Sequence, residues 1–99
     1  MTTPPSEKSI EARFVRECTK RGWLSLKQNV IGRRGFPDRL VVRQDGLHVW
    51  IELKRPGGRL SEGQKVAIDQ LTNHGALVFV CFSADEAIDI IERVEELLC

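Results

Sequence analysis

The chain has 99 residues, of which 41% are hydrophobic and 29% charged, and its net charge is only +1. This composition predicts one soluble globular domain over residues 1–99 and excludes a membrane-spanning protein, because no apolar run approaches the roughly 20 residues that cross a bilayer. The N-terminus lacks the apolar core of a signal peptide, and the three cysteines form no CxxC pair. We therefore expect a cytoplasmic protein without a disulfide framework or a zinc site.

The charges are distributed unevenly along the chain. Residues 1–82 carry a net charge of +6, whereas residues 83–99 carry −5. A polyanion is therefore expected to meet the first part of the chain and to avoid the last helix. Charge segregation alone is a weak signal, and a solvated charged face explains it equally well.

The first helix is expected after a short leader over residues 1–5. Ser6 is a suitable N-cap for a helix that runs to about Arg21. The apolar residues of this segment recur every four positions and predict one buried stripe, which consists of Ile10, Phe14 and Cys18. Glu11 lies beside that stripe, where a salt bridge to Arg13 or to a neighbouring strand is the alternative to a role in a functional site.

Three strands are expected next. The first covers Trp23–Gln28, and its inward-facing residues are expected to be Leu24 and Leu26. The second and third strands, Arg39–Arg43 and Leu47–Lys54, flank Asp45-Gly46, a dipeptide that strongly favours a tight hairpin turn. The hairpin therefore returns the end of the third strand to the start of the second.

Two loops rich in glycine and arginine are candidates for contacts with phosphate groups. One is Val30–Gly35, which precedes the hairpin, and the other is Arg55–Arg59, where Pro56 prevents the third strand from continuing. The predicted phosphate-binding residues are Arg33, Arg34, Arg55 and Arg59. Exposed turns that charge keeps soluble are the alternative interpretation.

The remaining elements follow in helix–strand–helix order. Ser61–Gln64 fits a capping box for a helix that ends at Asn73, and Gly75 suits a left-handed cap. Ala76–Phe82 is uniformly apolar, which is typical of a strand covered on both faces. Ser83–Glu86 fits a second capping box, and the last helix is expected to bury Ala87, Ile88, Ile91 and Leu98. The crossover between the third and fourth strands predicts parallel, right-handed pairing, and hence an α/β fold with a mixed sheet flanked by helices.

The hairpin also assembles a candidate metal site. Asp38 precedes the second strand, whereas Glu52 and Lys54 lie at the end of the third and share one face of it. Magnesium prefers oxygen ligands and is commonly held by one or two carboxylates together with a substrate phosphate. A metal there would activate a bound water, and Lys54 would neutralise charge that develops on phosphorus. A salt-bridge cluster without metal is the alternative.

These residues resemble a known signature. Pro37-Asp38, thirteen intervening residues and then Glu52-Leu53-Lys54 resemble the PD-(D/E)xK motif of the restriction-endonuclease-like superfamily. The wider runs Gly35–Leu40 and Glu52–Ser61, together with Gln64, are similar to the VRR-NUC family. This resemblance covers about Glu7 to Phe82 and implies an αβββαβ core.

The resemblance also implies roles for individual residues. Asp38 and Glu52 would bind Mg²⁺ or Mn²⁺ together with the backbone carbonyl of Leu53, and Lys54 would be the catalytic lysine. Gln64 would be the family's active-site glutamine. The family's first-helix glutamate, a further catalytic and metal-binding position, maps best to Glu11, with Glu7 as the alternative.

The family suggests what the site acts on. Stand-alone phage and bacterial members resemble homodimeric, structure-selective nucleases that cut four-way (Holliday) junctions, whereas multidomain members, such as the Fanconi-anaemia-associated nuclease, act on flaps. We therefore expect a Mg²⁺- or Mn²⁺-dependent DNA endonuclease that resolves four-way junctions as a homodimer. A flap or restriction-type nuclease on the same fold, or a DNA-binding module without catalysis, remain the alternatives.

A two-fold dimer would supply one site for each of the two incisions that a nearly two-fold symmetric junction needs. The candidate interfaces are the apolar edge near Trp23–Leu26 and the final helix. The final helix ends in an apolar tail of Leu97, Leu98 and Cys99.

Overall fold

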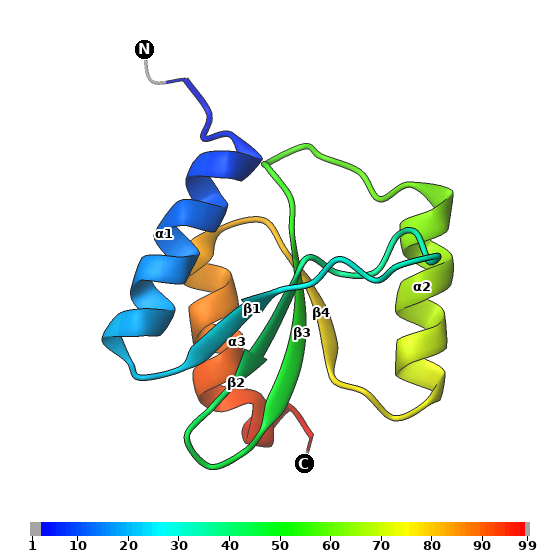
Figure 1. The fold of residues 1–99 in the computed structure, drawn as a ribbon. Helices are drawn as coiled ribbons and strands as arrows, with labels where there is room; N and C mark the ends of the chain where they lie inside the picture. The colour runs from blue at the N-terminus through cyan, green and yellow to red at the C-terminus, as the bar shows by residue number, and fades with distance from the viewer. Residues whose placement is uncertain (1–2, 99) are drawn as a thin grey trace.

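The computed structural model of the protein describes residues 3–98 and contains seven regular elements (Figure 1). In chain order these are α1 (Glu7–Lys20), β1 (Leu24–Lys27), β2 (Arg39–Val42), β3 (His48–Leu53), α2 (Glu62–Asn73), β4 (Val78–Cys81) and α3 (Ala84–Leu97). This order confirms the predicted α/β fold. Residues 1–2 of the expected leader, and Cys99 of the expected apolar tail, lie outside the described residues.

The four strands form one mixed sheet in the order β1-β2-β3-β4. β1 pairs antiparallel with β2, β2 pairs antiparallel with β3, and β3 pairs parallel with β4, as the crossover through α2 requires. The hairpin between β2 and β3 has a three-residue loop, since Arg43 and Leu47 are the last bonded pair and Gly46 takes a positive φ of 87°. The predicted mixed sheet and hairpin are both confirmed.

The local signals at the starts of α1 and α2 are also confirmed, and the signal at the start of α3 is confirmed in part. Ser6 caps α1, because its hydroxyl accepts a hydrogen bond from the Ser9 N–H at 3.1 Å. Ser61 and Gln64 form both bonds of the capping box at the start of α2. At the start of α3 only half of the expected box forms: Ser83 accepts from the Glu86 N–H, but the Glu86 carboxylate accepts from the Phe82 N–H.

Two helices cover one face of the sheet, and the third lies on the other side. Figure 1 shows α1 and α3 side by side against the sheet, with α2 on the opposite side. The hydrophobic core fills the layer between the sheet and the α1–α3 pair, and its fully buried side chains include Phe14, Val41, Val49, Ile51 and Ile91. On the other face, α2 contacts β4. The part of this face that β1 and β2 form is therefore left uncovered.

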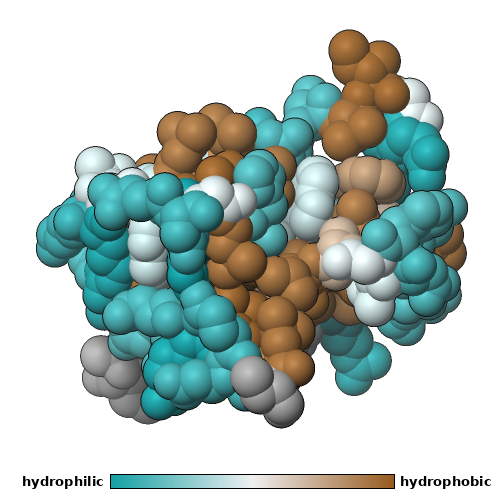
Figure 2. Space-filling view, turned by 90° about the horizontal axis from the view of Figure 1, so that it is seen from below, coloured by the Kyte–Doolittle hydropathy of each residue, from teal (hydrophilic) through white to brown (hydrophobic). Residues whose placement is uncertain are grey.

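This uncovered surface corrects the prediction for β1. Leu24 and Leu26 were expected to face inward, but they are 56% and 37% exposed. Strand alternation predicts that they share a face, but it does not reveal which face a helix will cover. Ser25, which pairs with the buried Val41, takes the helix side instead. Figure 2 shows hydrophobic surface between two hydrophilic parts of the molecule.

The end of the last helix also differs from the prediction. Ala87, Ile88 and Ile91 are buried as expected, but Leu98 is 61% exposed and Val94 is buried instead. Val94 continues the buried stripe three positions after Ile91, whereas Leu98 is the C-cap and lies beyond the last helical residue, Leu97.

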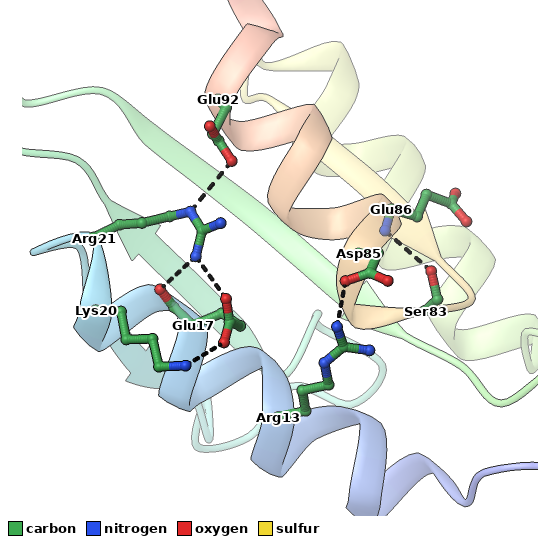
Figure 3. Close-up of polar contacts among 8 residues, drawn as sticks. All are labelled: Arg13, Glu17, Lys20, Arg21, Ser83, Asp85, Glu86 and Glu92. Carbon is green, nitrogen blue, oxygen red and sulfur yellow. Dashed lines mark hydrogen bonds and ion pairs between the residues drawn. The ribbon is translucent and has the colours of Figure 1, made fainter.

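Ion pairs join the two helices that cover the core (Figure 3). Arg13 on α1 contacts Asp85 on α3 at 2.7 Å, and Arg21, which follows α1, contacts Glu92 on α3 at 3.2 Å. All four side chains are at least one-third exposed, and such pairs stabilise proteins by about 0–1 kcal/mol. The apolar core, rather than these pairs, therefore supplies most of the packing energy. In the described part of the chain, no helix is long and apolar enough to cross a membrane.

Candidate active site

The hairpin places Asp38 and Glu52 opposite each other. Arg39 pairs with Ile51, so the next position outward joins Asp38, just before β2, to Glu52 near the end of β3. The backbone of Asp38 is held on its other side by Gln28, whose N–H donates to the Asp38 carbonyl at 2.7 Å. The two carboxylates, fourteen positions apart in sequence, therefore converge as the sequence predicts.

Glu52 is an unusual buried acid. Its residue is only 3% exposed, and its pKa is raised to about 7 by burial and, next, by the negative charge of Asp38. The charge of Lys54 acts in the opposite direction. Asp38 itself is exposed. A buried carboxylate beside a second one is unfavourable unless a cation compensates it, so this pair is suited to bind a cation.

Lys54 lies beside both Glu52 and the first helix. Its ammonium Nζ is 3.9 Å from Glu52 Oε2 and 3.8 Å from Glu7 Oε1, and its side chain is 12% exposed. Its backbone N–H donates to the Cys81 carbonyl at 2.9 Å, which continues the parallel pairing past the end of β3. The sheet therefore fixes the backbone of Lys54, and the two glutamates fix its side chain.

Gln64 reaches the same carboxylate from the first turn of α2. Its side-chain oxygen accepts a hydrogen bond from the Ser61 N–H at 2.9 Å, while its Nε2 donates to Glu52 Oε2 at 3.4 Å. The two ends of one amide therefore serve two purposes, the helix cap and the contact with Glu52. The helix cap fixes the orientation in which the amide meets the acid.

The two glutamates of α1 have different partners. Glu11 Oε2 accepts hydrogen bonds from Arg39 Nε at 2.8 Å and from Lys27 Nζ at 3.2 Å. Burial alone would raise the pKa of Glu11, but these two bonds outweigh burial, and the pKa lies below its ordinary value. Glu7, one turn earlier, pairs instead with Lys54 and adds to the negative field around Glu52. The structure therefore brings Glu7 closer to the predicted catalytic lysine and engages Glu11 with two strands.

A cavity of about 280 Å³ opens between α1 and the end of the hairpin. Its lining residues are Glu7, Lys8, Glu11, Asp38 and Leu53. Lys8 was not predicted as a site residue from the sequence. The one signal that could have identified it is its position on the helix, next to Glu7 and one turn before Glu11, which places it near the same space.

The donor groups at this cavity fit a hard divalent cation. Within residues 3–98 no three His, Cys, Asp or Glu side chains are arranged to hold a metal ion, so a ligand set must combine carboxylates with other oxygens. Asp38 and Leu53 line the cavity, and Glu52, which lies opposite Asp38 in the sheet register, supplies the second carboxylate. Magnesium commonly binds through one or two carboxylates and retains several waters, so this set matches its requirements.

The predicted phosphate-binding arginines lie in the two loops that leave the site. Figure 1 shows the β1–β2 loop and the β3–α2 loop both running from the sheet towards α2. Arg34, Arg55 and Arg59 are exposed. Arg33 is exposed as well, but its guanidinium donates to Gln70 Oε1 at 2.6 Å and lies 5.3 Å from the centre of the Phe36 ring.

A mixed sheet that gathers two acids, a lysine and a glutamine beside one cavity is the arrangement of a restriction-endonuclease-like nuclease. Residues 5–85 match the VRR-NUC domain family, and the chain belongs to this family. It is 39% identical over 71 residues to "Putative nuclease p44" of Acyrthosiphon pisum secondary endosymbiont phage 1, covering 72% of this chain and 70% of that protein.

A solved structure described as a VRR_NUC domain has the same fold. It superposes with a TM-score of 0.78 at 24% sequence identity, and the match covers 89% of this chain and 97% of the other. This superposition shows the fold, and the family match together with the 39% identical relative supports the nuclease class.

Proposed function

We propose that this VRR-NUC domain is a metal-dependent, structure-selective DNA endonuclease. The observation that supports this proposal is that Asp38, Lys54 and Gln64 converge around the buried carboxylate of Glu52. A cluster that served only as a salt bridge would not need to bury Glu52 beside a second acid, because that arrangement raises the energy of the ionised form.

The reaction is the hydrolysis of a phosphodiester bond, in which a water oxygen bonds to phosphorus and one ester oxygen leaves. Asp38, Glu52 and the carbonyl of Leu53 would hold Mg²⁺ or Mn²⁺, which polarises the phosphoryl oxygen and lowers the pKa of a bound water. Lys54 orients the attacking water and neutralises charge that develops on the phosphoryl oxygens. Gln64 keeps the Glu52 carboxylate in one orientation.

The two acids of α1 are assigned different roles. Glu7 positions the ammonium of Lys54, whereas Glu11, which the family resemblance favours as the first-helix acid, fixes Arg39 and Lys27 at the edge of the cavity.

We expect Glu7→Gln to reduce the rate of cleavage by about 10- to 100-fold with little change in melting temperature, since it loosens the group that holds the lysine. Glu11→Gln is expected to reduce the melting temperature more, because it breaks a half-buried pair with Arg39. Single-turnover cleavage in Mn²⁺ and thermal unfolding measure the two effects. A rate loss for Glu11→Gln at unchanged melting temperature would instead make Glu11 the catalytic acid.

The proposed substrate is branched DNA, with a four-way junction preferred. The exposed leucines of β1 support a homodimer, because β1 is an edge strand and an open edge with apolar side chains favours pairing with a second copy. A two-fold dimer places one site on each of two symmetry-related strands.

The experiment compares cleavage of a four-way junction, a flap and a linear duplex of equal length in Mg²⁺ and Mn²⁺, alongside the molecular mass in solution. Preferential paired incision of the junction by a particle of twice the chain mass supports the resolvase. Preference for the flap would support the alternative flap nuclease, and binding without cleavage would support a DNA-binding module.

The loop arginines are expected to contribute affinity without sequence preference. Arg34→Ala, Arg55→Ala and Arg59→Ala should each weaken DNA binding to a similar degree on unrelated sequences and reduce the slope of log K against log salt by about 1. Titrations at several salt concentrations measure this slope. A dependence on local base identity would contradict the assignment to phosphates.

A further inference from the structure

Ile31 is a hydrophobic side chain at the tip of the loop between β1 and β2, and it is 96% exposed. The tip is a tight turn, in which the Arg33 N–H donates to the Val30 carbonyl at 3.2 Å and Gly32 takes a positive φ of 78°. Ile31 is the first central residue of this turn. The turn therefore presents the side chain to solvent instead of folding it back onto the domain.

The side of the turn that leads into β2 is held by α2. The Arg33 guanidinium donates to Gln70 Oε1 at 2.6 Å and lies over the Phe36 ring. Phe36 in turn meets Trp50 of β3 edge-on, with ring centres 6.1 Å apart. These contacts join the loop to two other elements immediately after its tip.

The base of the loop is held as well. The Gln28 N–H donates to the Asp38 carbonyl, as described above, and this bond joins the two ends of the loop. Between the tip and β2, Gly35 packs so closely on the first turn of α2 that an added Cβ would clash with the Gly63 carbonyl oxygen. Ile31 therefore projects from a fixed support, and little conformational freedom remains to be lost when it binds.

The charges around the tip indicate the kind of partner. The loop over residues 28–37 contains no Asp or Glu, and it carries two cations, Arg33 and Arg34, which follow Ile31 at the tip. A protein or lipid partner that needed only an apolar contact would not require this uniform sign. An apolar side chain flanked by cations suits DNA, because the cations bind phosphates while the apolar group enters the base stack.

The tip is also tethered close to the proposed cleavage site. Asp38 is seven positions after Ile31, and a chain of that length spans at most roughly 25 Å. Successive base pairs are about 3.4 Å apart along the helix axis. When a phosphate lies at Asp38, Ile31 is therefore within about seven base steps of it.

We infer that Ile31 is a wedge that inserts between bases at the branch point of the DNA. This inference rests on the proposed nuclease function and adds a source of structure selectivity to it. Insertion requires unstacking, which costs least where stacking is already interrupted, as at a branch. The wedge therefore favours branched DNA over a continuous duplex without reading any base.

The test uses a four-way junction with the fluorescent base 2-aminopurine at the branch point, whose emission rises when it unstacks. With saturating protein in EDTA, which prevents cleavage, the unaltered protein should raise the emission several-fold. Ile31→Ala should retain less than about one-third of that rise, and Ile31→Leu should restore it. Anisotropy on the same samples verifies that the DNA is bound.

Val66→Ala is the matched control, since Val66 is another exposed β-branched residue, 56% exposed, on α2. It should behave as the unaltered protein does. An equal rise with Ile31→Ala, or no rise for the unaltered protein with the probe at any of the seven steps, would overturn the wedge. A change in molecular mass for Ile31→Ala with an unchanged rise would also overturn it and make Ile31 a contact between copies of the chain.

The two proposals can fail separately. Junction cleavage in Mn²⁺ without any fluorescence rise rejects the wedge and keeps the nuclease. A fluorescence rise that depends on Ile31, without cleavage of any DNA in Mg²⁺ or Mn²⁺, keeps the wedge and rejects the endonuclease.

Discussion

Lys54→Ala is expected to reduce the rate of junction cleavage by about 100- to 1,000-fold, the usual loss when one group that stabilises developing charge is removed. The ammonium lies 3.9 Å from Glu52 and 3.8 Å from Glu7, so its removal leaves two acids near the phosphate without a compensating cation. DNA affinity should change little, because many other cations contribute to it. Single-turnover cleavage in Mn²⁺ and binding in EDTA measure the two quantities separately.

Lys65→Ala is the matched control for this substitution. Lys65 lies on α2, its side chain is 55% exposed, and its partner in an ion pair is Glu62. Lys65→Ala removes one positive charge from the protein, as Lys54→Ala does, but it removes none from the surroundings of Glu52. Cleavage should therefore stay within about twofold of the unaltered rate, as for most surface substitutions. Undiminished cleavage by Lys54→Ala would refute the role assigned to Lys54.

Glu52→Gln is expected to abolish cleavage and at the same time to stabilise the metal-free protein at neutral pH. The Glu52 carboxyl has a pKa of about 7 in the folded chain, against an ordinary value of 4.5. Below pH 4.5 Glu52 is protonated in both the folded and the unfolded state, so it does not reduce the free energy of unfolding. As the pH rises from about 4.5 to 7, the unfolded state releases the proton first, so the free energy of unfolding falls.

Above about pH 7 the burial of Glu52 has its full effect, which reduces the free energy of unfolding by no more than about 3 kcal/mol. Glu52→Gln removes it, so the melting temperature in EDTA at pH 8 should exceed that of the unaltered protein, and the difference should vanish near pH 4. Mn²⁺ should raise the melting temperature of the unaltered protein but not that of the variant.

Glu96→Gln serves as the control, because Glu96 is an exposed acid on α3, outside the cavity. Its free energy of unfolding should stay within about 0.5 kcal/mol of the unaltered value at both pH values. A Glu52→Gln variant that is less stable than the unaltered protein at pH 8 in EDTA would contradict this prediction. It would show that contacts within the protein stabilise the Glu52 carboxylate without a metal ion.

Much of the site could be predicted from the sequence because its signals are local. Asp45-Gly46 specifies a hairpin, and strand alternation then fixes that Asp38 and Glu52 converge and that Lys54 follows on the same face. The capping box of Ser61 and Gln64 places the glutamine at the start of a helix. That this glutamine also donates to Glu52 depends on where α2 docks, which its sequence does not specify.

Other features depended on contacts between distant segments. Leu24 and Leu26 have the same alternation whether or not a helix covers them, and only the position of α2 beside β4 leaves them exposed. Glu7 and Glu11 lie one turn apart on the same helix face, so their sequence positions alone could not assign Lys54 to one and Arg39 to the other.

The sequence by itself thus determined the order of elements, the hairpin, the caps and the pairing of two acids with a lysine, because each follows from backbone propensity and from the two-residue period of a strand. Tertiary structure alone decided how deeply Glu52 is buried, which α1 acid meets Lys54 and which face of the sheet stays open. Those features depend on the packing of α1 and α2 against the sheet, and packing joins residues whose separation in sequence carries no local signal.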